Sequence, residues 1–256
     1  MTTASLTTVA APATPAQRIL NAAKLQFANP WTTITLPWMI LAIIFLANLA
    51  IWGIIYMGAA PADRADALAG TGWSGASMYI FVYMMVVAVQ AIAITFPFAL
   101  GYGVTRRDYY LGASLAFVGL AAMYSIGLTI LSVIEEATGG WGLGGSMFTA
   151  YYFGTGGWPE RLVIFFSAFL FFFFVGAAVA TVWVRWKANG LTVFFVALGA
   201  FVIGGAALLT FTSSWGLIGD FLGRAGFLGT YASSLVVTIL AAVLGFFILR
   251  RATPKS

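Results

Sequence analysis

The sequence contains no histidine and no cysteine, and only 7% of its 256 residues are charged. The missing imidazole and thiolate groups exclude the usual ligands of haem, zinc, copper and iron–sulfur clusters, together with disulfides and His- or Cys-based catalysis. An ordinary soluble domain is about 25% charged. Because 62% of the residues are hydrophobic, most side chains must face lipid or one another, and the composition predicts a membrane protein.

Six long apolar segments make up most of the chain. A membrane-crossing helix needs about 20 apolar residues, since roughly 30 Å of hydrocarbon is crossed at 1.5 Å per residue. The segments run from Leu36 to Met57, Met78 to Leu100, Leu111 to Ile134, Leu162 to Val184, Leu191 to Phe211 and Thr230 to Leu249. None contains Lys, Arg, Asp or Glu, so each enters lipid without burying a charge. We expect an all-α integral membrane fold with six transmembrane helices, formed by residues 31–256.

The charged residues are distributed unequally between the connections. With the N-terminus in the cytoplasm, nine of the twelve basic residues fall on the inner side and six of the seven acidic residues fall on the outer side. Lys and Arg are enriched on the cytoplasmic side of membrane proteins. We therefore expect an N-in/C-in protein of the bacterial cytoplasmic (inner) membrane, with both termini cytoplasmic.

The segment before the first span has two parts. Residues 1–13 are small and uncharged, and we expect them to form a disordered tail. Thr14, Pro15 and Gln17 then match the capping box of a helix start, and residues 14–30 are amphipathic. The apolar face holds Ile19, Leu20, Ala23 and Phe27. We expect this interfacial helix to lie along the inner membrane surface; an ordinary soluble lead-in helix is the alternative.

The spans carry no ionisable group of the kind that an ion-coupled carrier uses at mid-depth. Asn48 and Gln90 are the best candidates for contact with a polar cargo, although interhelical hydrogen bonding is the simpler role. The chain also lacks a P-loop, because the glycine-rich stretch 139–146 has no Lys at the position that reaches the phosphates. If the chain takes part in transport, its energy is expected to come from outside the lipid.

The short connection between the second and third segments is the most informative stretch. Pro97 and the pair Gly101 and Gly103 are suited to end one helix and turn the backbone. Thr105 is suited to cap a short following helix, with Asp108 in its first turn. The residues displayed at the cytoplasmic surface would be Arg106, Arg107, Tyr109 and Tyr110. This pattern predicts a compact peg with the composition of an interaction hot spot; the alternative is that these side chains only anchor the membrane boundary.

The sequence of this connection, LGYGVTRRDYYLG over residues 100–112, resembles the segment F-x-L-x-L-G-x-[ST]-R-[RK]-x-[FY]-[FY]-x-G of ABC-2 type transporter permeases. The six-span layout, the amphipathic entry helix and the chain length are similar too. In that family the peg is the coupling helix, which sits in a groove of a separate ATP-binding subunit. The resemblance implies a coupling role for Val104, Thr105, Arg106, Arg107, Asp108, Tyr109 and Tyr110.

The resemblance also implies the partners. It implies a homodimer of permeases with two copies of a separate ABC ATPase subunit, which would bind ATP and Mg and supply hydrolysis in trans. In this chain we expect no cofactor, metal site, catalytic residue or nucleic-acid contact. The resemblance implies an exporter, and the small number of charges along the path suggests an amphipathic or lipidic substrate. A non-transporting membrane scaffold or self-protection subunit is the alternative, and a passive channel or ion-coupled carrier is the least favoured.

Two connections on the outer side are unusually apolar. The glycine- and aromatic-rich stretch 135–160 is interpreted as a re-entrant piece over the exit or as a passive loop with an aromatic belt. Glu135 and Glu136 at its start are interpreted as a solvated helix end rather than a catalytic pair. Residues 212–229 are expected to form a short helix in the outer leaflet, with Asp220 and Arg224 paired on one face.

Overall fold

The computed structural model describes residues 14–252, so the tail expected over residues 1–13 lies outside the described part. Within it the chain is helical and has no strand, as the sequence predicted. The α-helices are α1 (Pro15–Leu25), α2 (Leu36–Gly58), α3 (Arg64–Ala69), α4 (Met78–Gln90), α5 (Phe96–Gly101), α6 (Arg106–Ala137), α7 (Trp158–Phe211) and α8 (Trp215–Arg250). The short helical turns between them are Trp31–Thr35, Gly70–Trp73, Ala91–Thr95, Gly140–Gly144 and Tyr151–Phe153.

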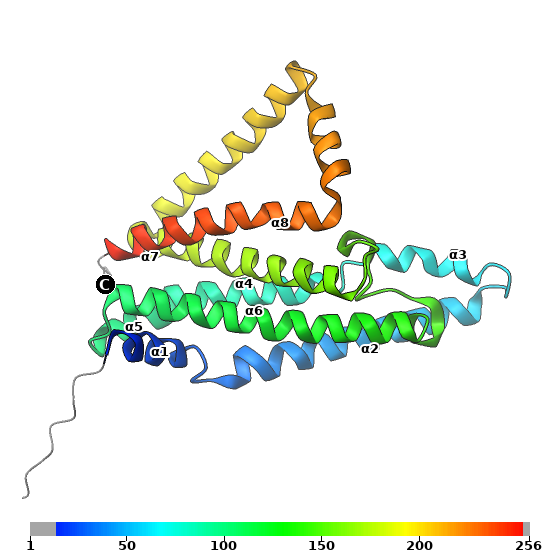
Figure 1. Ribbon diagram of the computed structural model, residues 1–256, viewed down its shortest axis with the longest axis horizontal. Coiled ribbons are helices and arrows are strands. Elements are labelled where there is room, and N and C mark those ends of the chain that lie inside the picture. Colours follow the sequence, from blue (N-terminus) through cyan, green and yellow to red (C-terminus); the bar gives the residue numbers. More distant parts are fainter. Residues whose placement is uncertain (1–13, 253–256) are drawn as a thin grey trace, which may run out of the picture.

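Five helical stretches are long and apolar enough to cross a membrane, which is compatible with a multi-pass membrane protein. They are Trp31–Gly58, Arg64–Gly101, Arg106–Ala137, Trp158–Phe211 and Trp215–Arg250. The fourth and fifth apolar segments of the sequence share α7. Its 54 residues would extend about 81 Å if straight, more than twice the hydrocarbon thickness. The helix is broken at Lys187, where φ is 57° and ψ is −148°, and its two halves diverge there (Figure 1).

The core lies between α4, α6 and the first half of α7. Phe81 of α4 packs on Phe169 of α7 with ring centroids 4.4 Å apart. Phe117 of α6 stacks on Phe173 of α7 at 5.1 Å. All four rings are buried, so the phenylalanine-rich start of α7 supplies the aromatic packing of the core rather than a cargo surface.

Small residues allow a close helix contact in only one half of α7. At Gly176 an added Cβ would lie 2.7 Å from the carbonyl oxygen of Met85 in α4, so the backbones touch there. At Gly204, in the second half, nothing lies within 4 Å of an added Cβ. The contact at Gly176 therefore lies within one subunit, whereas Gly204 makes no close helix contact within residues 14–252.

Two π-helical turns, Trp31–Thr35 and Ala91–Thr95, are each followed by a proline two residues later. Pro37 has no N–H, so it cannot donate to Thr33 in an α-helical register or to Thr32 in a π-helical one. Tyr83 of α4 donates its hydroxyl to the Thr32 carbonyl at 2.9 Å. Tyr124 of α6 donates to the Thr33 carbonyl at 2.7 Å. Tyrosines on two helices thereby satisfy carbonyls at the entry to α2.

The second half of α7 and the first part of α8 stand away from the bundle (Figure 1). Their apolar side chains are largely exposed; Phe201 is 78% and Phe211 is 88% exposed. Gly226, with φ of 62°, breaks α8, and the rest of α8 returns along the bundle (Figure 1). We name the segment from Ala188 to Gly226 the outer arm.

The helix expected within residues 212–229 is present as the first part of α8. The expected ion pair between Asp220 and Arg224 is wrong, because the ion pairs within residues 14–252 are Arg18–Asp108 and Glu136–Arg161. Both side chains are exposed on the outer arm. Solvated charges gain little from pairing, so four-residue spacing alone does not bring them together.

Candidate functional site

The motif at residues 104–110 forms the first turn of a long helix, not a separate short one. After α5 the chain turns at Gly103, whose φ of 78° favours glycine, and α6 then runs for 32 residues. Thr105 accepts a hydrogen bond from the Asp108 backbone N–H at 3.1 Å, so the predicted cap is confirmed. The predicted short helix is wrong, because no glycine or proline stop follows the cap before the apolar segment starts.

Asp108 anchors α1 to α6. Its buried carboxylate accepts a hydrogen bond from Nε of Arg18 at 2.9 Å. One turn further along α6, Gly112 permits close approach, since an added Cβ would lie 2.6 Å from the Cβ of Ala22 and 2.7 Å from the carbonyl oxygen of Ile19. A charge pair and a close backbone contact together hold α1 on the N-terminal end of α6.

The predicted start of α1 is confirmed, and the helix packs on α6 through small side chains. Thr14 and Gln17 form the capping box. The residues buried against α6 are Ala22 and Ala23, whereas the larger Leu20 and Phe27 are exposed. Small side chains are buried because Gly112 brings the two backbones together and leaves no space for large ones.

Tyr109 and Tyr110 are buried, so the prediction that they are displayed at the surface is wrong. The Tyr109 hydroxyl donates to the Ala91 carbonyl and accepts from Nε2 of Gln26. The Tyr110 hydroxyl donates to the Ala242 carbonyl of α8 at 2.7 Å. Their physical role here is to join α6 to α1, to the π-helical turn after α4, and to α8.

The surface of this region is formed by neighbouring residues. Arg107 is exposed, and the half-buried Arg106 donates to the Arg250 carbonyl at 3.3 Å. Tyr102 is 75% exposed and Phe98 is 60% exposed, with ring centroids 4.8 Å apart. We name the exposed group of Phe98, Tyr102 and Arg107 the inner knob. Sequence reasoning missed the two aromatic residues, although they flank the turn that it identified.

Asn48 and Gln90 have different environments. The Asn48 side chain donates to the Ile44 carbonyl of its own helix at 2.8 Å, so its hydrogen bond is local and does not reach another helix. Gln90 is exposed and lines a cavity of about 360 Å³ together with Gln26, Asn29 and other residues of the α1–α2 connection. Asn48 does not line this cavity, so the structure does not bring the two candidates together.

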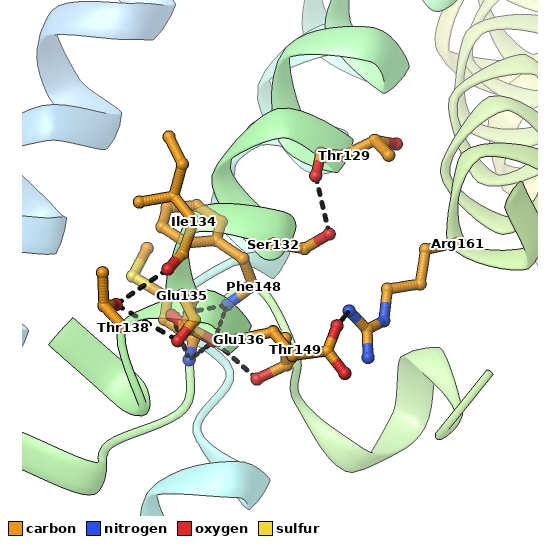
Figure 2. Close-up of polar contacts among 10 residues, drawn as sticks. Thr129, Ser132, Ile134, Glu135, Glu136, Thr138, Phe148, Thr149 and Arg161 are labelled. Carbon is orange, nitrogen blue, oxygen red and sulfur yellow. Dashed lines mark hydrogen bonds and ion pairs between the residues drawn. The ribbon is translucent and has the colours of Figure 1, made fainter. Parts of the chain in front are cut away.

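At the opposite end of the bundle, Glu135 organises the connection between α6 and α7 (Figure 2). Its carboxylate accepts hydrogen bonds from the backbone N–H groups of Met147, Phe148 and Thr149 at 2.8 to 3.0 Å. The Thr149 hydroxyl and the Trp141 indole N–H donate to it as well. We name residues 138–157 the outer cap.

The interpretation of Glu135 as a solvated helix end is wrong, because the residue is 1% exposed. Glycines with positive φ turn the chain back over the end of α6 and aim three successive N–H groups at the carboxylate. Its oxygens are occupied by five donors and are not free for acid–base chemistry.

One contact at the base of the outer cap joins α7 to α6, and a second holds the cap itself. Arg161 of α7 is buried and donates to Glu136 at 2.7 Å (Figure 2). Tyr152 donates its hydroxyl to the Ser74 carbonyl at 2.7 Å, and burial raises the pKa of this phenol above its ordinary value of 10.0. The cap is thus an ordered structure joined to α6, α7 and the connection before α4.

Comparisons of the chain with protein-family models, curated proteins and solved structures found no match. The geometry of the two ends of the bundle is therefore the basis for the function proposed below.

Proposed function

We propose that this chain is the membrane-spanning permease subunit of an ATP-driven exporter of the ABC-2 type, and that a separate ATPase subunit binds the inner knob. The observation that carries the proposal is the exposed group of Phe98, Tyr102 and Arg107 beside the motif at 104–110. Aromatic and arginine side chains contribute most of the binding energy in many protein interfaces.

The buried half of the motif supports transmission of movement. Asp108, Tyr109 and Tyr110 connect the base of the knob to α1, to the turn after α4 and to α8. A displacement imposed on the knob by an ATPase would therefore move several helices together, since packed elements shift as units. In this proposal Val104 and Thr105 to Arg107 lie at the contact, and the buried residues position them.

The proposed topology has six crossings, with both termini on the inner side of a bacterial cytoplasmic membrane. The break at Lys187 lies between two apolar runs, each long enough to cross once. It also lies at the same end of the bundle as α1 and the start of α6 (Figure 1), where basic residues are concentrated. In this arrangement α1 is the interfacial helix.

The proposed assembly contains two permease copies and two ATPase subunits that hold ATP and Mg. The outer arm exposes apolar side chains, including Phe201 and Phe211. These side chains need an apolar partner, and in this proposal a second permease copy or lipid covers them. The apolar spans support an amphipathic or lipidic substrate, which would pass between the two copies.

Co-purification with a separate ABC ATPase from the same organism tests the proposal. We expect Tyr102→Ala combined with Arg107→Glu to reduce stimulation of ATP hydrolysis at least tenfold without changing the thermal stability of the permease, because both side chains are exposed. Tyr109 is unsuitable for this test because it is buried. The matched control is Trp73→Ala, which removes an aromatic residue that is 71% exposed at the other end of the bundle.

Two outcomes would contradict the proposal. Wild-type levels of ATPase binding and stimulation in the knob variant would show that the knob is not the contact. Binding of the ATPase with no stimulation by the wild-type chain would favour the non-transporting scaffold.

A further inference from the structure

A large cavity lies at the break in α7. Its volume is about 800 Å³, within the range of about 300 to 1,000 Å³ that is typical of ligand sites. Ala178 and Val182 line it before the break, Val193 lines it after the break, and Leu244 of α8 lines the third side. These walls are apolar, and they exist because the two halves of α7 diverge at Lys187 (Figure 1).

The polar residues of this cavity include two cations and no acid. Arg185 and Lys187 both line it, and no Asp or Glu does. The Arg185 guanidinium lies over the Trp186 ring, 4.5 Å from its centroid. Neither cation takes part in an ion pair within residues 14–252. An apolar cavity with unneutralised positive charge is complementary to an anionic amphiphile.

Lys187 itself has an unusual backbone. A residue other than glycine at φ of 57° is strained. Beyond the break, α7 resumes as a helix, and the N-terminal end of a helix carries partial positive charge. The backbone after the break thus adds to the positive potential of the two side chains at the same point of the cavity.

The surroundings of the cavity are also basic. Figure 1 places the break in α7 at the same end as α1, the start of α6 and the end of α8. The basic residues of these segments within the described part are Arg18, Lys24, Arg106, Arg107, Arg185, Lys187, Arg250 and Arg251. The acidic residue there, Asp108, is paired with Arg18. By the distribution of charge this end faces the cytoplasm, where the membrane leaflet contains anionic lipids.

We infer that this cavity binds an anionic phospholipid, with the phosphate group between Arg185 and Lys187 and an acyl chain along the apolar walls. The inference does not depend on the exporter proposal, since the cavity is formed within one chain whatever the chain does. It differs from general attraction of a basic surface to lipid. It assigns the preference for an anionic headgroup to Arg185 and Lys187, and it assigns the acyl-chain contacts to one cavity.

Native mass spectrometry of the purified full-length protein tests the inference. Phosphatidylglycerol and phosphatidylcholine with identical acyl chains would be titrated separately in detergent micelles. We expect tighter binding of phosphatidylglycerol to the wild type. Each charge near a membrane surface changes lipid affinity about fivefold, so Arg185→Gln with Lys187→Gln is expected to reduce this preference about 25-fold. Both side chains lie at the protein surface, and thermal unfolding would verify that the variant is folded.

Three further arms distinguish lipid binding in this cavity from binding elsewhere on the basic surface. Arg251→Gln removes a charge at the same end outside the cavity and is expected to keep the preference within twofold. Ala178→Trp fills the apolar wall and is expected to weaken phosphatidylglycerol binding at least tenfold. Inorganic phosphate in excess is expected to displace little lipid, because it lacks the acyl chain.

Several results would overturn the inference. They are equal binding of the two lipids by the wild type, an unchanged preference in the double variant, a loss in Arg251→Gln as large as in the double variant, and unchanged binding in Ala178→Trp. Full displacement by inorganic phosphate would overturn it as well, by indicating an anion site without lipid contacts.

Discussion

Buried polar side chains in this protein form hydrogen bonds with backbone groups that have no backbone partner. Glu135 collects three successive N–H groups of the outer cap, and Tyr124 supplies a donor where Pro37 has none. In both cases the unpaired backbone groups would otherwise lie in an apolar environment, where an unsatisfied polar group is costly. These residues are therefore expected to determine local order rather than chemistry.

Replacing Glu135 by glutamine is expected to loosen the outer cap. The amide keeps one acceptor and adds two donors, which face N–H groups that also need acceptors. We expect a loss of about 2 to 3 kcal/mol of stability and faster hydrogen exchange over residues 138–157. Asp66→Asn, an exposed carboxylate on the same side, is the control. Unchanged exchange in Glu135→Gln would refute the role assigned to this carboxylate.

Replacing Tyr124 by phenylalanine removes only the hydroxyl that binds the Thr33 carbonyl. We expect a decrease of about 1 kcal/mol in the free energy of unfolding, since interhelical hydrogen bonds in membranes are of this order. Unfolding in detergent measures it. Tyr102→Phe removes an exposed hydroxyl and is expected to have no effect; equal values for the two variants would count against the proposed compensation of Pro37.

At the scale of elements, close backbone contacts decide which helices pack together. Gly112 allows α1 to touch α6, and Gly176 allows α4 to touch α7. Hydropathy alone does not distinguish these positions from glycines that face open space, because all lie within apolar sequence. The face that α1 turns toward α6 follows from the contact at Gly112, where alanines fit and larger side chains do not.

Two glycines of α6 form a matched pair for testing this contact. At Gly112 an added methyl group would collide with α1, whereas at Gly119 nothing lies within 4 Å. Gly119→Ala is expected to be neutral or to stabilise by up to about 1 kcal/mol through helix propensity. Gly112→Ala is expected to destabilise by about 1 to 3 kcal/mol and to increase hydrogen exchange in α1. Similar effects of the two substitutions would show that α1 does not depend on this contact.

At the scale of the whole molecule, the bundle has two chemically different ends. One end carries the inner knob, the basic residues and the cavity at the break in α7, and the opposite end carries the hydrogen-bonded outer cap. The outer arm joins the two parts of α7 and α8 that lie along the bundle (Figure 1). Ser213 lies between α7 and α8. The number of times that α7 crosses the membrane, once or twice, determines on which side Ser213 lies.

Labelling of single introduced cysteines tests the topology. The sequence has no native cysteine, so only the introduced residue reacts. A membrane-impermeant maleimide would be applied to cells and to inverted vesicles. With six crossings, we expect Gly101→Cys and Ala188→Cys to react from the cytoplasmic side, and Ala62→Cys and Ser213→Cys from the outer side. Reaction of Ala188→Cys and Ser213→Cys from the same side would exclude the second crossing by α7.

The local features of the fold were predictable because they depend on neighbouring residues. Helical apolar segments follow from hydropathy, and the caps at Thr14 and Thr105 follow from the side-chain oxygen that each residue places beside free N–H groups. The turn at Gly103 follows from the conformational freedom of glycine. The kink that joins two apolar segments into α7 was not predicted, because an apolar pattern does not indicate how a helix continues through a polar connection.

The sequence by itself determined that the chain is apolar enough for a membrane, where its helical segments lie and how they are capped, since these depend on composition and on residues a few positions apart. Only the tertiary structure decided that Asp108, Tyr109 and Tyr110 face inward, that Glu135 is enclosed, and that the break at Lys187 borders a cavity. The physical reason is that a side chain of a helix becomes interior or exterior according to the elements that pack against it, and these come from distant parts of the chain.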